Sequence, residues 1–294
     1  MSTQIKKIFT VLKTAFKSWF KKDPFRESAV IAYYAIFALP GLLVITMTLG
    51  GYFFGNDAVN NQVAAQFSAT MGSETANQIQ DIIIQASKLQ NSVLATIVGI
   101  TTILIGATGV FAEFQKSLNT IWEVKLDTNK SGIWQIIRVR LFSFGLIISI
   151  TFLMIVSLLI STLIAAFGTW LSSHFSESFL LILTVLNYGI SFTILTVLFA
   201  LMFKILPDVK IKWKNVWIGS FVTAFLFEIG KLALGMYFGN ANPGTGYGAA
   251  GSIILIMLWV SYSSMIVFYG AEFTHAFAKT FAEKITPTKI AKAI

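Results

Sequence analysis

Residues 179–238 carry the sequence FLLILTVLNYGISFTILTVLFALMF KILPDVKIKWK NVWIGSFVTAFLFEIGKLALGMYF, in which two apolar runs flank a short basic segment. The first run, 179–203, has no charged residue, and the segment 204–214 holds four lysines. A helix rises ~1.5 Å per residue, so each run is long enough to cross a hydrocarbon core of ~30 Å. The stretch therefore predicts two membrane-spanning helices joined by a basic loop.

Four further apolar runs contain no Asp, Glu, Lys or Arg: 29–54, 92–111, 141–171 and 248–271. The whole chain is 55% hydrophobic and only 12% charged, which leaves too little polar surface for a soluble globule of 294 residues. We expect an all-α membrane protein with six transmembrane helices in one domain, 23–278. An N-terminal segment, 1–22, precedes this domain and a tail, 279–294, follows it.

The positive charges fall almost entirely on one side of the six runs. Of 22 Lys and Arg residues, seven lie in 1–28, five in 112–140, four in 204–214 and four in 272–294. Short loops rich in Lys and Arg stay in the cytoplasm. The pattern therefore predicts that both termini are cytoplasmic and that the loops 55–91, 172–178 and 239–247 face outward.

The N-terminal segment has the spacing of an amphipathic helix. One arc holds Ile5, Ile8, Phe9, Leu12, Phe16, Trp19 and Phe20, and the other holds Lys6, Lys13, Lys17 and Lys21. The pattern favours a helix in the inner-leaflet interface; the alternative is a topology anchor without a further role. Asp23-Pro24 is expected to cap and start the next helix. Apolar residues at helical spacing in 55–91 predict short external helices.

The net charge of +9 favours anionic lipid headgroups as partners rather than nucleic acid, because the basic residues flank the spans instead of forming a stripe on a soluble domain.

No cysteine is present, so disulfides and thiolate ligands are excluded. The sequence indicates no cofactor and no metal site, and a homo-oligomer is left open.

Glu228 and Lys231 are ionisable residues inside the fifth run and share one helix face. Charges within a span are costly and usually face a bundle interior or a cavity, where they pair. The pair is either a self-neutralising structural contact or a site that meets a charged part of a substrate. Tyr33 and Tyr34 of the first run are candidate neighbours of this site.

Small and polar stripes mark other helices, either for close packing or for lining a cavity. Gly106 and Gly109 belong to such a stripe, and Pro40 predicts a kink in the first span. Glycines of the segment GYGAAG, 246–251, match a dinucleotide motif, but no strand precedes them. Gly248 and Gly251 instead suggest a tight entry into the sixth helix.

Four charged residues lie near the predicted cytoplasmic boundary: Glu113, Glu272, Arg138 and Arg140. They form either a polar cluster at the inner mouth of the bundle or ordinary interfacial charges that snorkel to water. The topology places His174 and His275 on opposite sides of the membrane, and no serine lies in a G-x-S-x-G motif. These observations argue against an enzyme.

Four segments together resemble the YihY/BrkB family of bacterial inner-membrane proteins: AYYAIFALPGLLVI (32–45), IGATGVFAEFQKSLNTIWEV (105–124), ILPDVKIKWKNVWIGS (205–220) and YGAAGSIILIMLWVSYSSMIVFYGAEFTHA (247–276). The matching positions are Tyr33, Tyr34, Pro40, Gly106, Gly109, Asn119, Trp122, Pro207, Gly219, Tyr247, Gly248, Gly270 and Glu272. The resemblance implies a six-helix protein of the inner membrane with both termini inside. The family carries ribonuclease BN and virulence-factor labels and suggested links to envelope lipid transport, without an agreed activity.

The residues and the resemblance together favour a transporter or flippase-like protein for a lipid or another charged amphiphile of the cell envelope. The alternative is a non-catalytic membrane scaffold or envelope assembly factor. A polar cavity between the helices would distinguish the two, because only the first function needs one.

Overall fold

The computed structural model describes residues 3–55, 93–127, 177–241, 243–281, 285–288 and 290–294, with single positions at 60, 61, 64, 68 and 80. The third apolar run, nearly all of the external loop 55–91, Arg138 and Arg140 lie outside the described residues. Predictions that concern them remain predictions.

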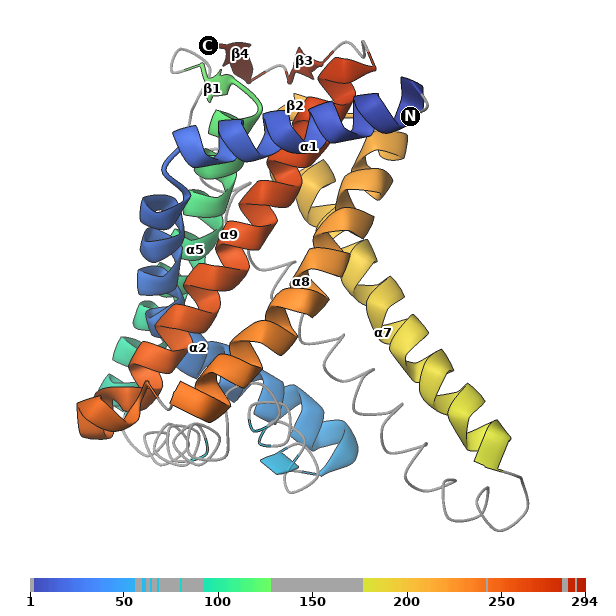
Figure 1. Cartoon of the computed structure of the whole chain (residues 1–294). Coiled ribbons are helices and arrows are strands. Elements are labelled where there is room, and N and C mark those ends of the chain that lie inside the picture. Colours follow the sequence, from blue (N-terminus) through green and yellow to red (C-terminus); the bar gives the residue numbers. More distant parts are fainter. Residues whose placement is uncertain are drawn as a thin grey trace.

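Long helices make up most of the described chain (Figure 1). The α-helices are α1 Thr3–Lys21, α2 Pro24–Phe54, α5 Val93–Ile121, α7 Glu177–Ile205, α8 Trp213–Ala241 and α9 Gly251–Thr280, with a 3₁₀ helix η2 Thr245–Ala250 before α9. Four short strands are β1 Val124–Leu126, β2 Val209–Lys210, β3 Thr286–Pro287 and β4 Ala291–Ala293.

Five of the six apolar runs fall on described helices, namely α2, α5, α7, α8 and α9. Within the described residues, three stretches are long and apolar enough to cross a membrane: Tyr188–Ile205 of α7, all of α8 and all of α9. The described chain is therefore mostly helical, as predicted, but it is not all-α, because four short strands form two small sheets at one end. The number of six spans stays a prediction.

The contact between α8 and α9 is built from two glycines and two threonines. Gly219 of α8 faces Thr274 of α9, and Gly270 of α9 faces Thr223 of α8. Each threonine hydroxyl donates a 2.7 Å hydrogen bond to the carbonyl of the glycine four residues earlier in its own helix. The buried hydroxyls are thereby satisfied, and the missing glycine side chains let the two backbones approach closely.

Small residues also set the contact between α2 and α5. A side chain at Gly106 would lie 2.6 Å from the backbone of Ala38, and one at Gly109 would lie 2.3 Å from the ring of Tyr34. The packing interpretation therefore holds for both glycines. The helix α2 continues through Pro40 and bends along its length (Figure 1), as a helix with an internal proline often does.

The entry into α9 is tight, as GYGAAG suggests. Gly248 lies in η2, and Gly251 is the first residue of α9. A side chain at Gly251 would lie only 2.5 Å from the carbonyl oxygen of Gly244.

Both ends of the chain lie at the same end of the bundle, which we call the α1 end (Figure 1). The C-terminal tail is not a free extension there. Strand β4 pairs with β1, and β3 pairs with β2, both antiparallel. The tail thus holds the loop after α5 and the loop between α7 and α8.

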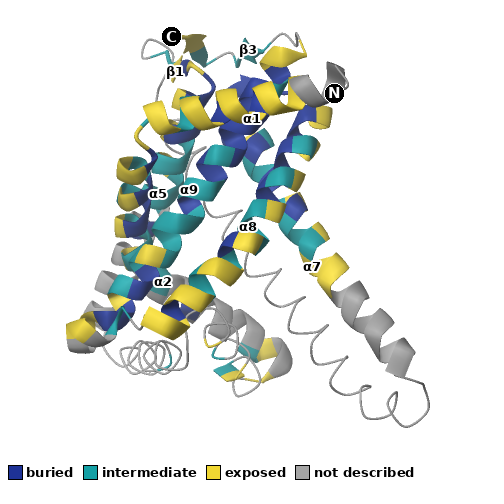
Figure 2. Cartoon of the chain, in the orientation of Figure 1, coloured by how far each residue is buried: buried dark blue, intermediate teal, exposed yellow. Residues whose placement is uncertain are grey.

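Helix α1 crosses the α1 end and packs on α9 (Figure 1). Val11 and Ala15 are buried in this contact, whereas Phe9, Phe16 and Phe20 are exposed. Figure 2 shows buried and exposed positions alternating along α1. The sequence predicted an apolar and a basic face for this helix. The structure adds a third face, which holds the helix on the bundle.

Candidate functional site

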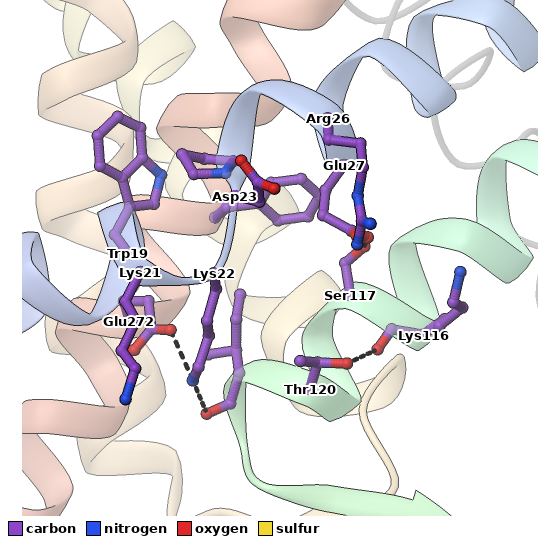
Figure 3. A pocket seen from close by; sticks show the side chains of 13 residues that line it. Trp19, Lys21, Lys22, Asp23, Arg26, Glu27, Lys116, Ser117, Thr120 and Glu272 are labelled. Carbon is purple, nitrogen blue, oxygen red and sulfur yellow. Dashed lines mark hydrogen bonds and ion pairs between the residues drawn. The ribbon is translucent and has the colours of Figure 1, made fainter.

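A pocket of about 370 Å³ opens at the α1 end, where α1 meets α2, α5 and α9 (Figure 3). Its walls combine aromatic, charged and hydroxyl side chains from all four helices. The lining residues are Trp19, Lys21, Lys22, Asp23, Pro24, Arg26, Glu27, Lys116, Ser117, Thr120, Ile121, Phe268 and Glu272.

Lys22 turns inward from the end of α1 and joins three elements. Its Nζ lies 2.8 Å from Oε1 of Glu272 and donates a 3.1 Å hydrogen bond to the carbonyl of Ile121 (Figure 3). Glu272 is only 1% exposed, so its carboxylate depends on this ion pair for charge compensation. Of the four predicted boundary charges, Glu272 is therefore part of a buried polar cluster rather than a snorkelling group.

The turn between α1 and α2 aims Lys22 into the bundle. Asp23 adopts the left-handed conformation with φ 56° and ψ 56°, which Asp tolerates better than most residues. Pro24 starts α2 as expected, but Asp23 makes no side-chain capping hydrogen bond, so the capping prediction is wrong. Asp23 also lines the pocket.

Trp19 fixes the other side of this turn. Its Nε1 donates a 3.1 Å hydrogen bond to the carbonyl of Met265, and its ring packs edge-on against Tyr269 at 6.1 Å. The sequence placed Trp19 on the lipid-facing arc. The structure instead turns it toward α9, because the indole N–H finds a carbonyl acceptor there.

The wall formed by α2 and α5 carries hydrogen-bonded charges. Ser117 donates a 2.7 Å hydrogen bond to Glu27, which also pairs with Arg26 at 3.0 Å. Lys116 pairs with Glu113 at 2.7 Å, and this hydrogen bond raises the pKa of Lys116 above its ordinary value. Glu113 therefore reaches the site through Lys116 and does not itself line the pocket.

Glu228 and Lys231 form the ion pair that their spacing indicates, with 2.6 Å between Oε2 and Nζ. The side chains are 34% and 36% exposed, respectively. Gly230, between them in the sequence, packs against Tyr262 and Ile266 of α9. The pair is therefore neither sealed in a dry helix contact nor fully exposed.

Tyr33 and Tyr34 occupy a different part of the bundle. Their helix, α2, packs on α5 and α9, whereas α8 packs on α7 and α9. The ring of Tyr34 covers Gly109, and Tyr33 is 54% exposed. Among the described contacts, none joins either tyrosine to Glu228 or Lys231, so their sharing a site stays a prediction.

Sequence reasoning missed the role of Lys22 and a second buried polar cluster. Asp208 is 2% exposed and accepts hydrogen bonds from Gln115 at 3.0 Å and Asn119 at 2.9 Å. Asn119 Oδ1 in turn accepts from the backbone N–H of Asp208 at 2.8 Å. This cluster locks the basic loop after α7 onto α5. For Lys22, the available signal was its helical spacing with Val11, Ala15 and Ser18.

Within the described residues, no group of three or more His, Asp and Glu side chains is arranged to hold a metal ion. The chemistry that the pocket offers is recognition through ammonium, guanidinium, carboxylate and hydroxyl groups beside two aromatic rings.

Comparisons with known proteins place the chain among membrane proteins of one family. The family model of the virulence factor BrkB matches residues 15–294. A UPF0761 membrane protein of Teredinibacter turnerae is 25% identical over 89% of this chain and 59% of its own length. A similar protein of Saccharophagus degradans is 24% identical, and the match covers 58% of its length. The chain thus spans about three fifths of these relatives.

The ribonuclease-like protein YfkH of Bacillus subtilis is 26% identical over 89% of this chain and 92% of its own length. No solved structure matches the chain. Because the family model covers nearly all of the sequence, including the pocket, α8 and the paired C-terminal tail, the chain belongs to the BrkB family of membrane proteins.

Proposed function

We propose that this protein moves a lipid or another charged amphiphile of the cell envelope across or within the inner membrane, without catalysing a reaction. In this proposal the α1 end faces the cytoplasm, as the distribution of Lys and Arg indicates. The relatives from Teredinibacter turnerae and Saccharophagus degradans are named as membrane proteins, which fits this setting.

The ion pair of Glu228 and Lys231 carries the proposal. It lies in the middle of α8, a helix long and apolar enough to cross the membrane. A charged side chain at the centre of a bilayer costs at least ~2.5 kcal/mol on insertion scales. If the pair served only helix packing, burying both side chains between helices would shield them from lipid and lower this free-energy cost. About a third of each side chain is open instead, so the charges are available to a charged group that passes α8.

The exposed surface of α1 is a second observation that favours an amphiphilic substrate. Its exposed surface combines aromatic side chains such as Phe9 and Phe16 with lysines such as Lys13 and Lys17. Such a surface suits the boundary between headgroups and acyl chains. We place anionic headgroups of the cytoplasmic leaflet against it.

The experiment is transport of fluorescent lipids or amphiphiles by the full chain in reconstituted vesicles. Lys231→Met keeps the bulk of the side chain and removes its charge, so we expect a folded protein with transport reduced at least tenfold. Lys214→Met is the matched control, because Lys214 is exposed on the first turn of the same helix, outside the apolar run. If Glu228 without its partner impairs folding, the double variant Glu228→Gln and Lys231→Met removes both charges together.

Full transport by the folded double variant would refute the role of the ion pair. It would favour the alternative, a scaffold or assembly factor in which the pair has a structural role. The ribonuclease-like name belongs to YfkH, and we propose no such activity for this chain.

A further inference from the structure

We propose that the pocket at the α1 end binds the phosphate of an anionic phospholipid headgroup. The inference rests on the proposed handling of lipids, because it names the substrate class and the place where its headgroup is held. Three cations at the rim, Lys21, Arg26 and Lys116, supply the contacts (Figure 3).

The deeper groups of the pocket already have partners. Lys22 is held by Glu272 and by the carbonyl of Ile121. Glu27 accepts a 2.7 Å hydrogen bond from Ser117. A buried charge that has lost its partner is strongly destabilising, so these contacts stay in place when a ligand enters. They make a floor of fixed shape.

The rim cations are different because their contacts are exposed. The side chains of Arg26 and Lys116 are 71% and 68% exposed, and each pairs with a carboxylate near it on its own helix. Exposed ion pairs of this kind contribute little, about 0–1 kcal/mol. Lys21 is exposed and makes no ion pair within the described part of the chain. Arg26 and Lys116 can therefore turn to a phosphate at small cost, and Lys21 adds an exposed positive charge at the rim.

The charge of the lining selects the class of ligand. The lining includes four cationic side chains, from Lys21, Lys22, Arg26 and Lys116, and three carboxylates. The lining side chains alone leave one positive charge, and the carboxylate of Glu113, which pairs with Lys116, lies outside the lining. A phosphodiester that takes the place of Glu113 at Lys116 meets this single positive charge with its single negative charge. A headgroup that adds a quaternary ammonium carries no net charge and gains less from this rim.

The surroundings favour a lipid over free phosphate. The ring of Trp19 lies at the pocket and contacts the rings of Phe16 and Phe25, with centroids 5.6 Å and 6.4 Å away. Phe16 and Phe25 are 57% and 59% exposed. An apolar surface thus borders the cationic rim. A cavity of about 370 Å³ accommodates a headgroup and leaves acyl chains outside along this surface.

The test is calorimetric titration of the full chain in neutral detergent with dihexanoyl-phosphatidylglycerol. Dihexanoyl-phosphatidylcholine tests the dependence on net charge, and inorganic phosphate tests whether acyl chains are needed. We expect saturable binding of phosphatidylglycerol that is at least about tenfold tighter than binding of either of the other two.

Two double variants remove the same number of charges. Lys21→Gln with Lys116→Gln alters the rim and should weaken binding of phosphatidylglycerol about tenfold or more. Lys210→Gln with Lys214→Gln removes two exposed charges, in β2 and at the start of α8, that do not line the pocket and do not lie on α1, and it should change binding less than twofold. Thermal unfolding of both variants checks that the fold is intact.

Equal losses in the two double variants would overturn the pocket and leave only general attraction to a basic surface. Inorganic phosphate that binds as tightly as phosphatidylglycerol would overturn a lipid as the source of the phosphate. Equal binding of phosphatidylcholine would overturn the preference for an anionic headgroup. The transport proposal is refuted by a different result. If the protein binds phosphatidylglycerol at the rim but moves no lipid in reconstituted vesicles, the binding site stands and the transport function is refuted.

Discussion

Replacing Gly219 with alanine should separate α8 from α9. The new methyl group would lie 1.8 Å from Oγ1 of Thr274 and 2.8 Å from its Cβ, whereas ordinary contact begins at about 3.4 Å. Rotating the threonine side chain removes only the first of these two clashes, and it breaks the 2.7 Å hydrogen bond to Gly270. The backbones themselves must therefore move apart.

The expected cost is at the upper end of that for overpacking a core, ~2–3 kcal/mol of unfolding free energy. It can be measured by titrating the purified protein from mild detergent into denaturing detergent and following tryptophan fluorescence. Gly239→Ala is the matched control, because Gly239 lies on the same helix with nothing within 4 Å of the added carbon. Alanine is the better helix former, so the control should be neutral or stabilising by up to ~1 kcal/mol.

A second substitution tests the cause. Thr274→Ala in the Gly219→Ala background removes the nearest oxygen but keeps the Cβ, so it should restore part of the lost stability and not all of it. The two substitutions should then be non-additive, as expected for residues in contact. Equal stability of Gly219→Ala and Gly239→Ala, or full additivity of the pair, would refute the close approach of the two helices.

Three further outcomes can be checked. Lys22→Met leaves the carboxylate paired with it on α9 buried and alone, so unfolding in denaturing detergent should become easier by ~3 kcal/mol. Cysteines introduced at Asn77 and Thr128 should react with an impermeant thiol reagent in intact cells only at position 77, because loop 55–91 is predicted to be external. Lys279 donates hydrogen bonds to Glu123 and lowers its pKa below the ordinary 4.5. This ion pair ties the start of β1 to α9, and its contribution is present above pH about 4.5 and is lost as the pH falls through the lowered pKa, so amide exchange in 124–126, corrected for the intrinsic rate, should increase in acid.

The helices were predictable because the bilayer leaves few alternatives. An uncharged run of more than twenty residues has to satisfy its backbone groups internally, and a helix does so. Glycines at helical spacing, such as Gly106 and Gly109, indicated either close packing or the lining of a cavity, and in the structure both lie against α2. They could not indicate which neighbour approaches, because a missing side chain is compatible with any partner surface.

The paired tail was not predictable for a different reason. β3 and β4 have two and three residues, too few for the alternation that marks a strand. Their stability comes from partners distant in the sequence: β2 lies in the loop after α7, and β1 follows α5. A tail that pairs with two loops connects the ends of α5, α7 and α9, which a free cytoplasmic extension does not.

The position of Lys22 shows most clearly where charge counting stops being sufficient. Counted with the other N-terminal cations, Lys22 indicates only that the N-terminal segment lies on the cytoplasmic side of the membrane. In the fold, the left-handed turn at Asp23 directs it inward to Glu272, and this contact helps to hold α1 on α9. The adjacent Lys21 points away from that pair and stays exposed at the pocket rim (Figure 3). Two neighbouring lysines with the same contribution to topology thus have different places in the fold, because Glu272 holds Lys22 at the floor of the pocket, whereas Lys21 stays exposed at its rim.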